Sequence, residues 1–360
     1  MPAANGPWLW GPRVDLAVFG GSAALSLALV ALAPRLAGEG GALPTWGFLL
    51  FVIVVDVAHV YSTLFRTYFD TSELRRRPLL YAGVPLACFL CGLGLHAVSR
   101  EWFWRGLAYV ALLHFVRQQV GWVAIYRARA GLSKKLVDRV IDDAAVYVAT
   151  LYPVLVWHAT PRSFSWFLPG DFVEAPALAP LLPAASVLYA AVLAVYAMRA
   201  VMLALQGSVQ LGKHVVVITT AATWYIGIVA TDSDFTFTVA NVIVHGVPYV
   251  AFLWFYARER ARDQPLALGS RLVLRGGLAL FYGVLLAIAF FEEMIWDRLV
   301  WHAHPQLFGG VASDEALLSA GITAVVVPLL AVPQATHYVL DAVIWRRGET
   351  GRAQARAMGF

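Results

Sequence analysis

The chain has 360 residues, of which 60% are hydrophobic and only 14% are charged. Its mean hydropathy is +0.69, whereas about a quarter of the residues in a soluble domain carry a charge. Lys and Arg outnumber Asp and Glu by 27 to 22, but the basic residues lie in particular loops, so the excess is not typical of a nucleic-acid-binding protein. These values exclude an ordinary soluble domain and predict a polytopic membrane protein.

The first apolar segment is interpreted as a retained helix rather than a cleaved signal peptide. Cleavage after the Ala-Leu-Ala at 31–33 would leave Pro34 as the first residue, and Asp15 lies in the flank that is basic in a signal peptide.

Apolar segments long enough to cross a bilayer, which takes about 20 residues, run from end to end of the chain. They are 14–34, 46–69, 79–98, 103–127, 141–158, 180–204, 212–230, 236–257, 272–293 and 317–345. Pro333 is expected to kink the last of them. We therefore predict an all-α, polytopic integral membrane helix bundle of about ten transmembrane helices, forming a single transmembrane domain over residues 1–360.

Positive charge alternates between the loops that join these segments. The loops after the second, fourth, sixth and eighth segments and the C-terminal tail carry Lys and Arg. The alternate loops are poor in both, namely 35–45, 99–102, 159–179, 231–235 and 294–316. Because basic loops stay on the cytoplasmic side, both termini are predicted to be cytoplasmic. The expected location is a bacterial inner (cytoplasmic) membrane.

The second segment carries an unusual row of polar residues. Asp56, His59, Thr63, Arg66 and Asp70 are spaced 3, 4, 3 and 4 residues apart. At 3.6 residues per turn this spacing predicts one polar stripe on a helix. A polar stripe at membrane depth is expected to face protein, water or a ligand rather than lipid.

Four of the nine histidines lie inside even-numbered segments, which all cross the membrane in the same direction. They are His59, His114, His245 and His337. Each has polar neighbours at helical spacing, among them Asp56, Gln118, Asn241 and Asp341. Whether His214, at the start of the seventh segment, belongs with them stays open.

Four ionisable residues at similar depth in a membrane are costly, which favours a shared use. Imidazole binds iron, copper and zinc, and a ligating histidine usually donates its second nitrogen to a carboxylate or amide. We therefore predict that His59, His114, His245 and His337 bind a metal. Asp56, Gln118, Asn241 and Asp341 would orient them or complete the cofactor site. In the alternative, each histidine only forms a hydrogen bond to a neighbouring helix.

The motifs that the sequence lacks bear on the identity of the metal. The HxxxH and HxxHH clusters of membrane desaturases and the HExxH of zinc proteases are absent. Ligands scattered one per helix resemble, in chemistry and architecture, the Brp/Blh type of bacterial carotenoid-cleaving dioxygenase, a polytopic membrane protein with histidine-ligated iron. No local motif matches residue by residue, so no site is transferred. Non-haem iron is ranked first, with haem b between histidine pairs or copper as alternatives.

Four further residues are candidates for catalysis. Arg66 and Arg117 follow His59 and His114 toward the cytoplasm and would bind the anionic head of a lipid-like substrate, or else form structural ion pairs. Tyr249 and Tyr338 would donate hydrogen bonds to oxygen or substrate.

The predicted function is an integral-membrane, metal-dependent oxidoreductase or oxygenase. Its lipophilic substrate would enter from the lipid bilayer, dioxygen would bind at open metal positions, and an electron-donor protein is a possible partner. The alternatives are a b-type haem protein in electron transfer and a proton- or ion-coupled transporter that uses the same His, Asp and Arg residues.

Two further motifs are weaker signals of function. Cys88 and Cys91 lie in an apolar segment and are interpreted as core residues rather than a redox pair. His302 and His304, with the acidic residues at 292, 293 and 297 nearby, are a weaker candidate for an external metal site.

Overall fold

A computed structural model describes residues 8–131, 135–309, 319–345 and 352–360. All regular structure in these ranges is helical, with no strand among them, which confirms the all-α prediction. The described helices that are long and apolar enough to cross a membrane number nine. They are Pro12–Leu36, Glu39–Phe65, Pro78–Val98, Leu136–Ala159, Pro176–Leu205, Leu211–Ala230, Asp234–Asp263, Leu268–Trp301 and Gly321–Ile344.

The predicted segment 103–127 is helical but is not one of these nine. It lies in one long helix, α7 (Arg100–Arg129). Charged residues such as Arg105, Arg117 and Arg127 lower its hydropathy, so its composition alone does not identify it as a membrane span. Nine spans therefore follow from length and composition, and the tenth stays a prediction.

The last predicted segment, 317–345, is interrupted as expected. Residues 317 and 318 lie outside the described ranges, and the rest forms α14 (Ala320–Leu330) and α15 (Val332–Ile344). The break at Ala331 stands just before Pro333, which occupies the first turn of α15. Proline has no N–H to donate and restricts the residue before it, so a helix ends or kinks there.

Residue contacts divide the chain into two compact units. Unit 1 comprises Met1–Pro44, Leu112–Ala251 and Gln354–Phe360, and unit 2 comprises Thr45–Ala111 and Phe252–Ala353. Helix α7 and helix α11 (Asp234–Asp263) each contribute residues to both units. The prediction of a single membrane domain stays a prediction.

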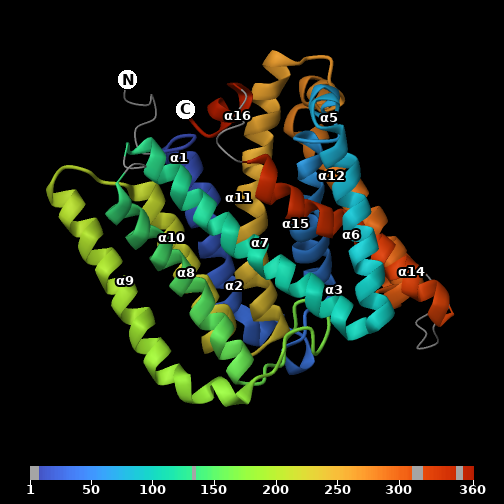
Figure 1. Cartoon of the computed structure of the whole chain (residues 1–360), viewed down its shortest axis with the longest axis horizontal. Helices are drawn as coiled ribbons and strands as arrows, with labels where there is room; N and C mark the ends of the chain where they lie inside the picture. The colour runs from blue at the N-terminus through green and yellow to red at the C-terminus, as the bar shows by residue number, and fades with distance from the viewer. Residues whose placement is uncertain (1–7, 132–134, 310–318, 346–351) are drawn as a thin grey trace. The chain divides into compact units, whose positions relative to one another are not determined.

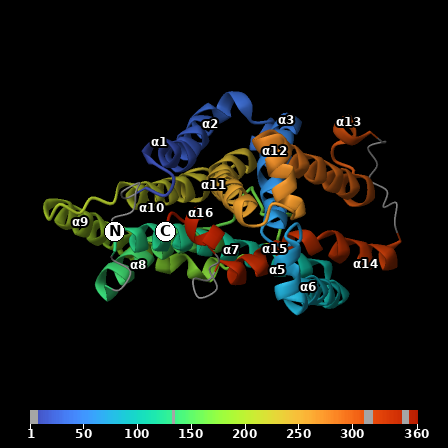
Figure 2. The same ribbon diagram turned by 90° about the horizontal axis from the view of Figure 1, so that it is seen from above.

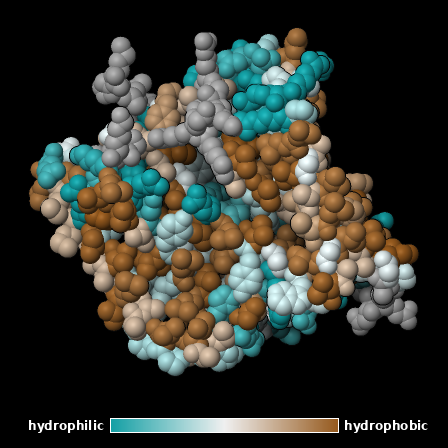
Figure 3. All heavy atoms as spheres, viewed as in Figure 1, coloured by the Kyte–Doolittle hydropathy of each residue, from teal (hydrophilic) through white to brown (hydrophobic). Residues whose placement is uncertain are grey.

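Unit 1 contains, besides parts of α7 and α11, a group of helices in which α8 packs against α9 and α10 (Figure 1). Its elements are α1 (Pro12–Asp15), η1 (Leu16–Gly21), α2 (Ser22–Leu36), η2 (Glu39–Gly41), α8 (Leu136–Ala159), η5 (Pro176–Leu181), α9 (Leu182–Leu205), α10 (Leu211–Trp224), η6 (Tyr225–Ala230) and α16 (Arg352–Ala357). Large apolar side chains such as Val187, Leu188 and Val201 on α9 are exposed, as expected for a surface that faces lipid. Hydrophobic residues also cover much of the face seen in Figure 3.

Buried ion pairs join the helices of unit 1. Asp142 on α8 accepts a hydrogen bond from Lys213 Nζ on α10 at 2.8 Å and lies 3.4 Å from Arg127 Nη1 on α7. Arg199 on α9 binds Asp138 on α8 at 2.7 Å. Lys213 and Asp142 are each only 2% exposed, so each charge depends on its partner for stabilisation.

Unit 2 contains, besides parts of α7 and α11, the segment that carries the polar stripe and a group in which α6 packs against α14 and α15 (Figure 2). Its further elements are α3 (Thr45–Gly47), η3 (Phe48–Val57), α4 (Ala58–Ser62), η4 (Thr63–Phe65), α5 (Thr71–Arg76), α6 (Pro78–Val98), α12 (Leu268–Trp296), η7 (Asp297–Trp301) and α13 (Pro305–Phe308).

The prediction that all five stripe residues lie on one regular α-helix is wrong. The segment is π-helical in η3, α-helical in α4 and 3₁₀-helical in η4, and it ends at Phe65. Asp70 lies beyond this end and caps α5, where its carboxylate accepts the N–H groups of Ser72 and Glu73. The changing helical period rotates successive side chains differently from a 3.6-residue repeat.

Gly227 in η6 is tightly packed against α11. A Cβ at Gly227 would lie 2.6 Å from Ala240 Cβ, so Gly227→Ala is expected to lower the free energy of unfolding by about 1–3 kcal/mol through overpacking. Gly83→Ala in α6 is the matched control, since its Cβ would meet nothing within 4 Å. Thermal unfolding in detergent should show a loss for the first variant and none for the second. Equal melting temperatures for the two variants would contradict the packing.

Candidate metal site

All four histidines predicted to bind a metal are buried. His59, His114, His245 and His337 are 0%, 7%, 1% and 2% exposed. They belong to groups of buried histidine and carboxylate side chains that could hold a metal ion. Within each unit the structure brings two of them together.

In unit 2 the pair is His59 on α4 and His337 on α15, with ring centroids 4.9 Å apart and ring planes at 79°. Asp56 Oδ1 lies 3.4 Å from His59 Nδ1. Thr63 Oγ1 forms a hydrogen bond with His337 Nδ1 at 2.8 Å, and Asp341 Oδ1 lies 3.8 Å from the same nitrogen. Asp56 and Asp341 thus lie beside the histidines that the sequence assigned them.

In unit 1 the pair is His114 on α7 and His245 on α11, with ring centroids 5.0 Å apart and ring planes at 77°. Phe115 stacks on the His245 ring at 3.5 Å between centroids. Gln118 Nε2 donates to the backbone oxygen of His245 at 2.9 Å, and Asn241 Nδ2 donates to the backbone oxygen of Phe237 at 2.8 Å. Both amides therefore donate hydrogen bonds to backbone oxygens, whereas the sequence predicted that they would orient the imidazole rings or complete the site.

The geometry of each pair suits a shared cation. Metal–imidazole bonds are about 2.0–2.1 Å long, so two nitrogens on one ion lie only about 3–4 Å apart. Ring centroids at 4.9 and 5.0 Å with nearly perpendicular planes allow such an approach with small rotations. Second nitrogens held by Thr63 or a carboxylate, as in unit 2, are typical of metal-binding histidines.

The two tyrosines predicted to act in catalysis are buried. Tyr249 is 3% exposed and follows His245 by one turn of α11. Tyr338 is 5% exposed, follows His337 directly on α15 and forms a hydrogen bond with Gln334.

The two arginines differ in their surroundings. Arg66 is 3% exposed, its Nη1 lies 3.3 Å from Glu73 Oε2, and its guanidinium lies 5.3 Å from the Tyr256 ring centroid. Arg117 is exposed on α7 and donates to Tyr147 Oη at 2.9 Å. Arg66 thus forms the ion pair that the sequence left open as an alternative, whereas Arg117 binds a neutral tyrosine, and the substrate-binding role of both stays a prediction.

The carboxylates around Arg66 form a charged network at the end of the second span. Burial alone would raise the pKa of Glu73, but hydrogen bonds from Arg76 and the charge of Arg66 lower it below its usual value. In the same way, burial acts to raise the pKa of Asp70, and the hydrogen bonds from Arg260 and Ser72 lower it. Both carboxyls are therefore ionised partners of arginines at neutral pH.

Sequence reasoning missed two carboxylates of unit 2. Glu292 and Glu293 on α12 were grouped with the external histidines, but Glu292 forms a hydrogen bond with Tyr61, and the carboxylates of Glu293 and Asp56 are near enough to repel each other. Tyr61 and Asp56 both belong to the segment that carries His59. The signal was available, because two adjacent Glu residues inside an apolar helix are costly without a partner.

The weaker external candidate has a structural explanation. Asp297 Oδ1 accepts the N–H groups of Ala303 and His304 at 2.8 Å each, and the His304 ring stacks on Phe48 at 4.0 Å between centroids. Asp297, one acidic residue of the external motif, thus caps a turn.

Cys88 and Cys91 are free cysteines and form no disulfide bond.

Comparison with known proteins adds no relative: no family model, no curated protein and no solved structure matches the chain.

Proposed function

We propose that this chain is an integral-membrane, metal-dependent oxidoreductase, most simply a non-haem iron oxygenase, in which His59, His114, His245 and His337 hold one metal ion. The observation that carries the proposal is the arrangement of buried imidazoles in close pairs. Burying four ionisable rings among apolar helices costs a few kcal/mol each on insertion scales, and a shared cation recovers that cost.

The pair geometry favours a single ion over haem. A porphyrin between two histidines keeps their rings apart on opposite faces of its plane, whereas the rings of His59 and His337 approach edge to face at 4.9 Å. Imidazole is also a good ligand for copper and zinc. Iron ranks first because the sequence lacks the HExxH motif of zinc hydrolases, and the metal would supply the redox chemistry.

The chain's own residues would position the metal and the substrate. Asp56, Asp341 and Thr63 would orient the imidazoles of unit 2. Gln118 would position α11 through the backbone oxygen of His245, and Asn241, one turn before His245 on α11, would complete the site. Tyr249 and Tyr338 would donate hydrogen bonds to substrate. A carotenoid, another isoprenoid or an acyl lipid would enter from the bilayer, and an electron-donor protein would supply reducing equivalents.

The membrane topology belongs to the same proposal. We propose that α7 is the tenth span, since the alternation of basic and non-basic loops holds through the chain only if this segment crosses the membrane. Both termini would then lie in the cytoplasm of a bacterial cell, as the alternating loop charges favour.

Elemental analysis together with an absorption spectrum of the purified protein tests this function. We expect one transition-metal ion per chain and no Soret band. A Soret band would assign haem instead. A protein without any stoichiometric metal would favour the proton- or ion-coupled transporter, for which the carboxylates Asp56, Glu292 and Glu293 would form a relay.

Thr63→Val is expected to weaken metal binding about 10–100-fold, because it removes the hydrogen bond that orients His337. Thr67→Val is the matched control. Thr67 is equally buried, and its hydroxyl donates to the backbone oxygen of Thr63. Competition with a chelator measures the metal affinity of both variants. The same loss in both would show that Thr63 has no orienting role.

A further inference from the structure

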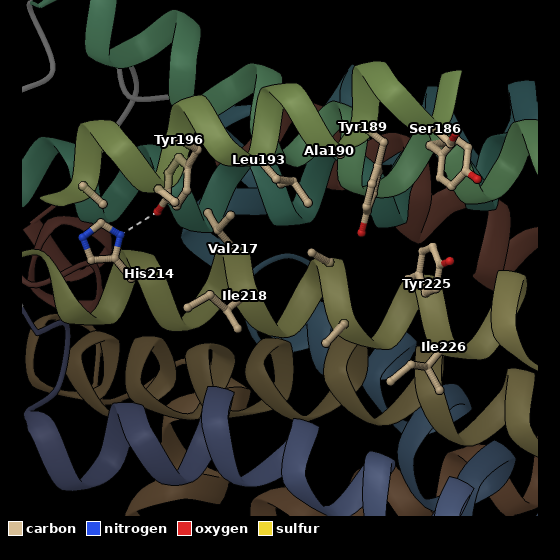
Figure 4. Close-up of a pocket in the computed structure, with 15 residues that line it drawn as sticks. Ser186, Tyr189, Ala190, Leu193, Tyr196, His214, Val217, Ile218, Tyr225 and Ile226 are labelled. Atoms are coloured by element: carbon tan, nitrogen blue, oxygen red, sulfur yellow. Dashed lines mark hydrogen bonds between the residues drawn. The ribbon is translucent and has the colours of Figure 1, made fainter. Parts of the chain in front are cut away.

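A pocket of about 780 Å³ lies within unit 1, apart from the histidine pairs. It is lined by α8, α9, α10 and η6, and Figure 4 shows it as a long space between α9 and α10. The volume falls in the range of sites for small molecules. All four elements belong to spans long and apolar enough to cross a membrane, so a ligand would reach the pocket from the bilayer.

One end of the pocket carries a hydrogen-bonded pair. Tyr196 Oη on α9 and His214 Nδ1 on α10 lie 2.7 Å apart (Figure 4). This contact places His214 in the pocket wall, with a tyrosine as its partner.

The other end carries three tyrosines from three elements. Tyr152, Tyr189 and Tyr225 have ring centroids 4.9 Å apart for the first two and 5.8 Å apart for the last two. Their hydroxyls make no hydrogen bond within the described chain, and Figure 4 shows the Tyr189 hydroxyl directed into the space between α9 and α10. Three hydroxyls gathered at one end of an apolar pocket can exchange hydrogen bonds with a hydroxyl group on a ligand.

The middle of the pocket is apolar, and its wall is uncharged. Leu193, Val217 and Ile218 lie between the two polar ends (Figure 4). None of the described residues that line the pocket is Asp, Glu, Lys or Arg. Lys213, next to His214 in the chain, donates a hydrogen bond to Asp142. An uncharged wall disfavours a phosphate or carboxylate head group, whose desolvation would have no compensation.

The length of the pocket fits an extended chain. His214 and Tyr225 are eleven residues apart on one helical run, which corresponds to roughly 16 Å at 1.5 Å per residue. We propose that this pocket binds a neutral long-chain alcohol, with the hydroxyl at the three tyrosines and the chain along Leu193 and Val217. This site goes beyond the proposed metal function and does not depend on it.

Photolabelling of the full-length protein in nanodiscs tests the proposal. The probe is hexadecanol that carries a diazirine. We expect labelled peptides from α9 and α10, and roughly tenfold less labelling in Ala222→Trp, where the indole fills the pocket. Leu188→Trp is the matched control on the exposed face of α9 and should label as the wild type does. Equal labelling of the wild type and Ala222→Trp would overturn the proposal.

A second variant removes only the hydroxyls and keeps the shape. In the wild type, hexadecanol should compete with the probe at least tenfold better than hexadecane. Tyr152→Phe/Tyr189→Phe/Tyr225→Phe should lose this preference, because the ligand's hydroxyl then has none of its three tyrosine partners. If the two competitors act equally on the wild type, or if the preference survives in the triple variant, the pocket does not recognise an alcohol. Metal content should stay unchanged throughout, which separates this test from that of the metal site.

Discussion

Lys213→Ala is expected to lower the free energy of unfolding by about 3–5 kcal/mol, because it leaves the Asp142 carboxylate buried without its closest cation. The 2.8 Å contact joins α8 to α10 in unit 1. Unfolding in detergent, followed by circular dichroism or by the rate of loss of the folded state, measures the effect.

Two companion variants separate the ion pair from other consequences of the substitution. Arg139→Ala removes a largely exposed partner of Asp143 and should cost no more than about 1 kcal/mol. Lys213→Met/Asp142→Leu replaces both charges by apolar side chains and should recover most of the lost stability. If Lys213→Ala is no worse than Arg139→Ala, the pair does not stabilise the unit.

His245→Ala is expected to remove the metal from the purified protein, with an affinity loss of at least about 100-fold. Changes that affect only the partners of metal-binding histidines already cost 10–100-fold, and loss of a ligand costs more. His158→Ala is the control, because His158 Nδ1 donates a hydrogen bond to the backbone oxygen of Val173 at 2.7 Å and lies outside the candidate site.

Any oxygenase activity of the chain should fall together with its metal content. Folding is checked by gel filtration and by the melting temperature, since an alanine at a buried position also leaves a small cavity. A folded His245→Ala protein that keeps its full metal content would remove His245 from the ligand set.

The hydropathy of the chain was sufficient to predict its helical class and most of its spans. It does not identify α7 as a span, because charged residues such as Arg105, Arg117 and Arg127 lower the hydropathy of this helix. It also misled at residues 51–70, where the prediction assumed one helical period. The structure uses π-, α- and 3₁₀-helical turns there, so Asp70 caps the next helix instead of continuing the stripe.

The histidines were identifiable because isolated ionisable residues in apolar segments are conspicuous. Their immediate partners were predicted only where helical spacing decides them, as for Asp56 with His59 and Asp341 with His337. Gln118 and Asn241 bind backbone oxygens, a choice that depends on side-chain rotation. The hydrogen bond of Glu292 with Tyr61 comes from packing between distant segments, which the spacing of residues along the sequence does not predict.

The central claim is that the two histidine pairs serve one metal ion, and the metal stoichiometry of pair variants tests it most directly. We expect one ion per wild-type chain and none after either His59→Ala/His337→Ala or His114→Ala/His245→Ala, as measured by mass spectrometry of the purified, folded proteins. One double variant that keeps its metal while the other loses it, or half the metal remaining in each, would contradict a shared site.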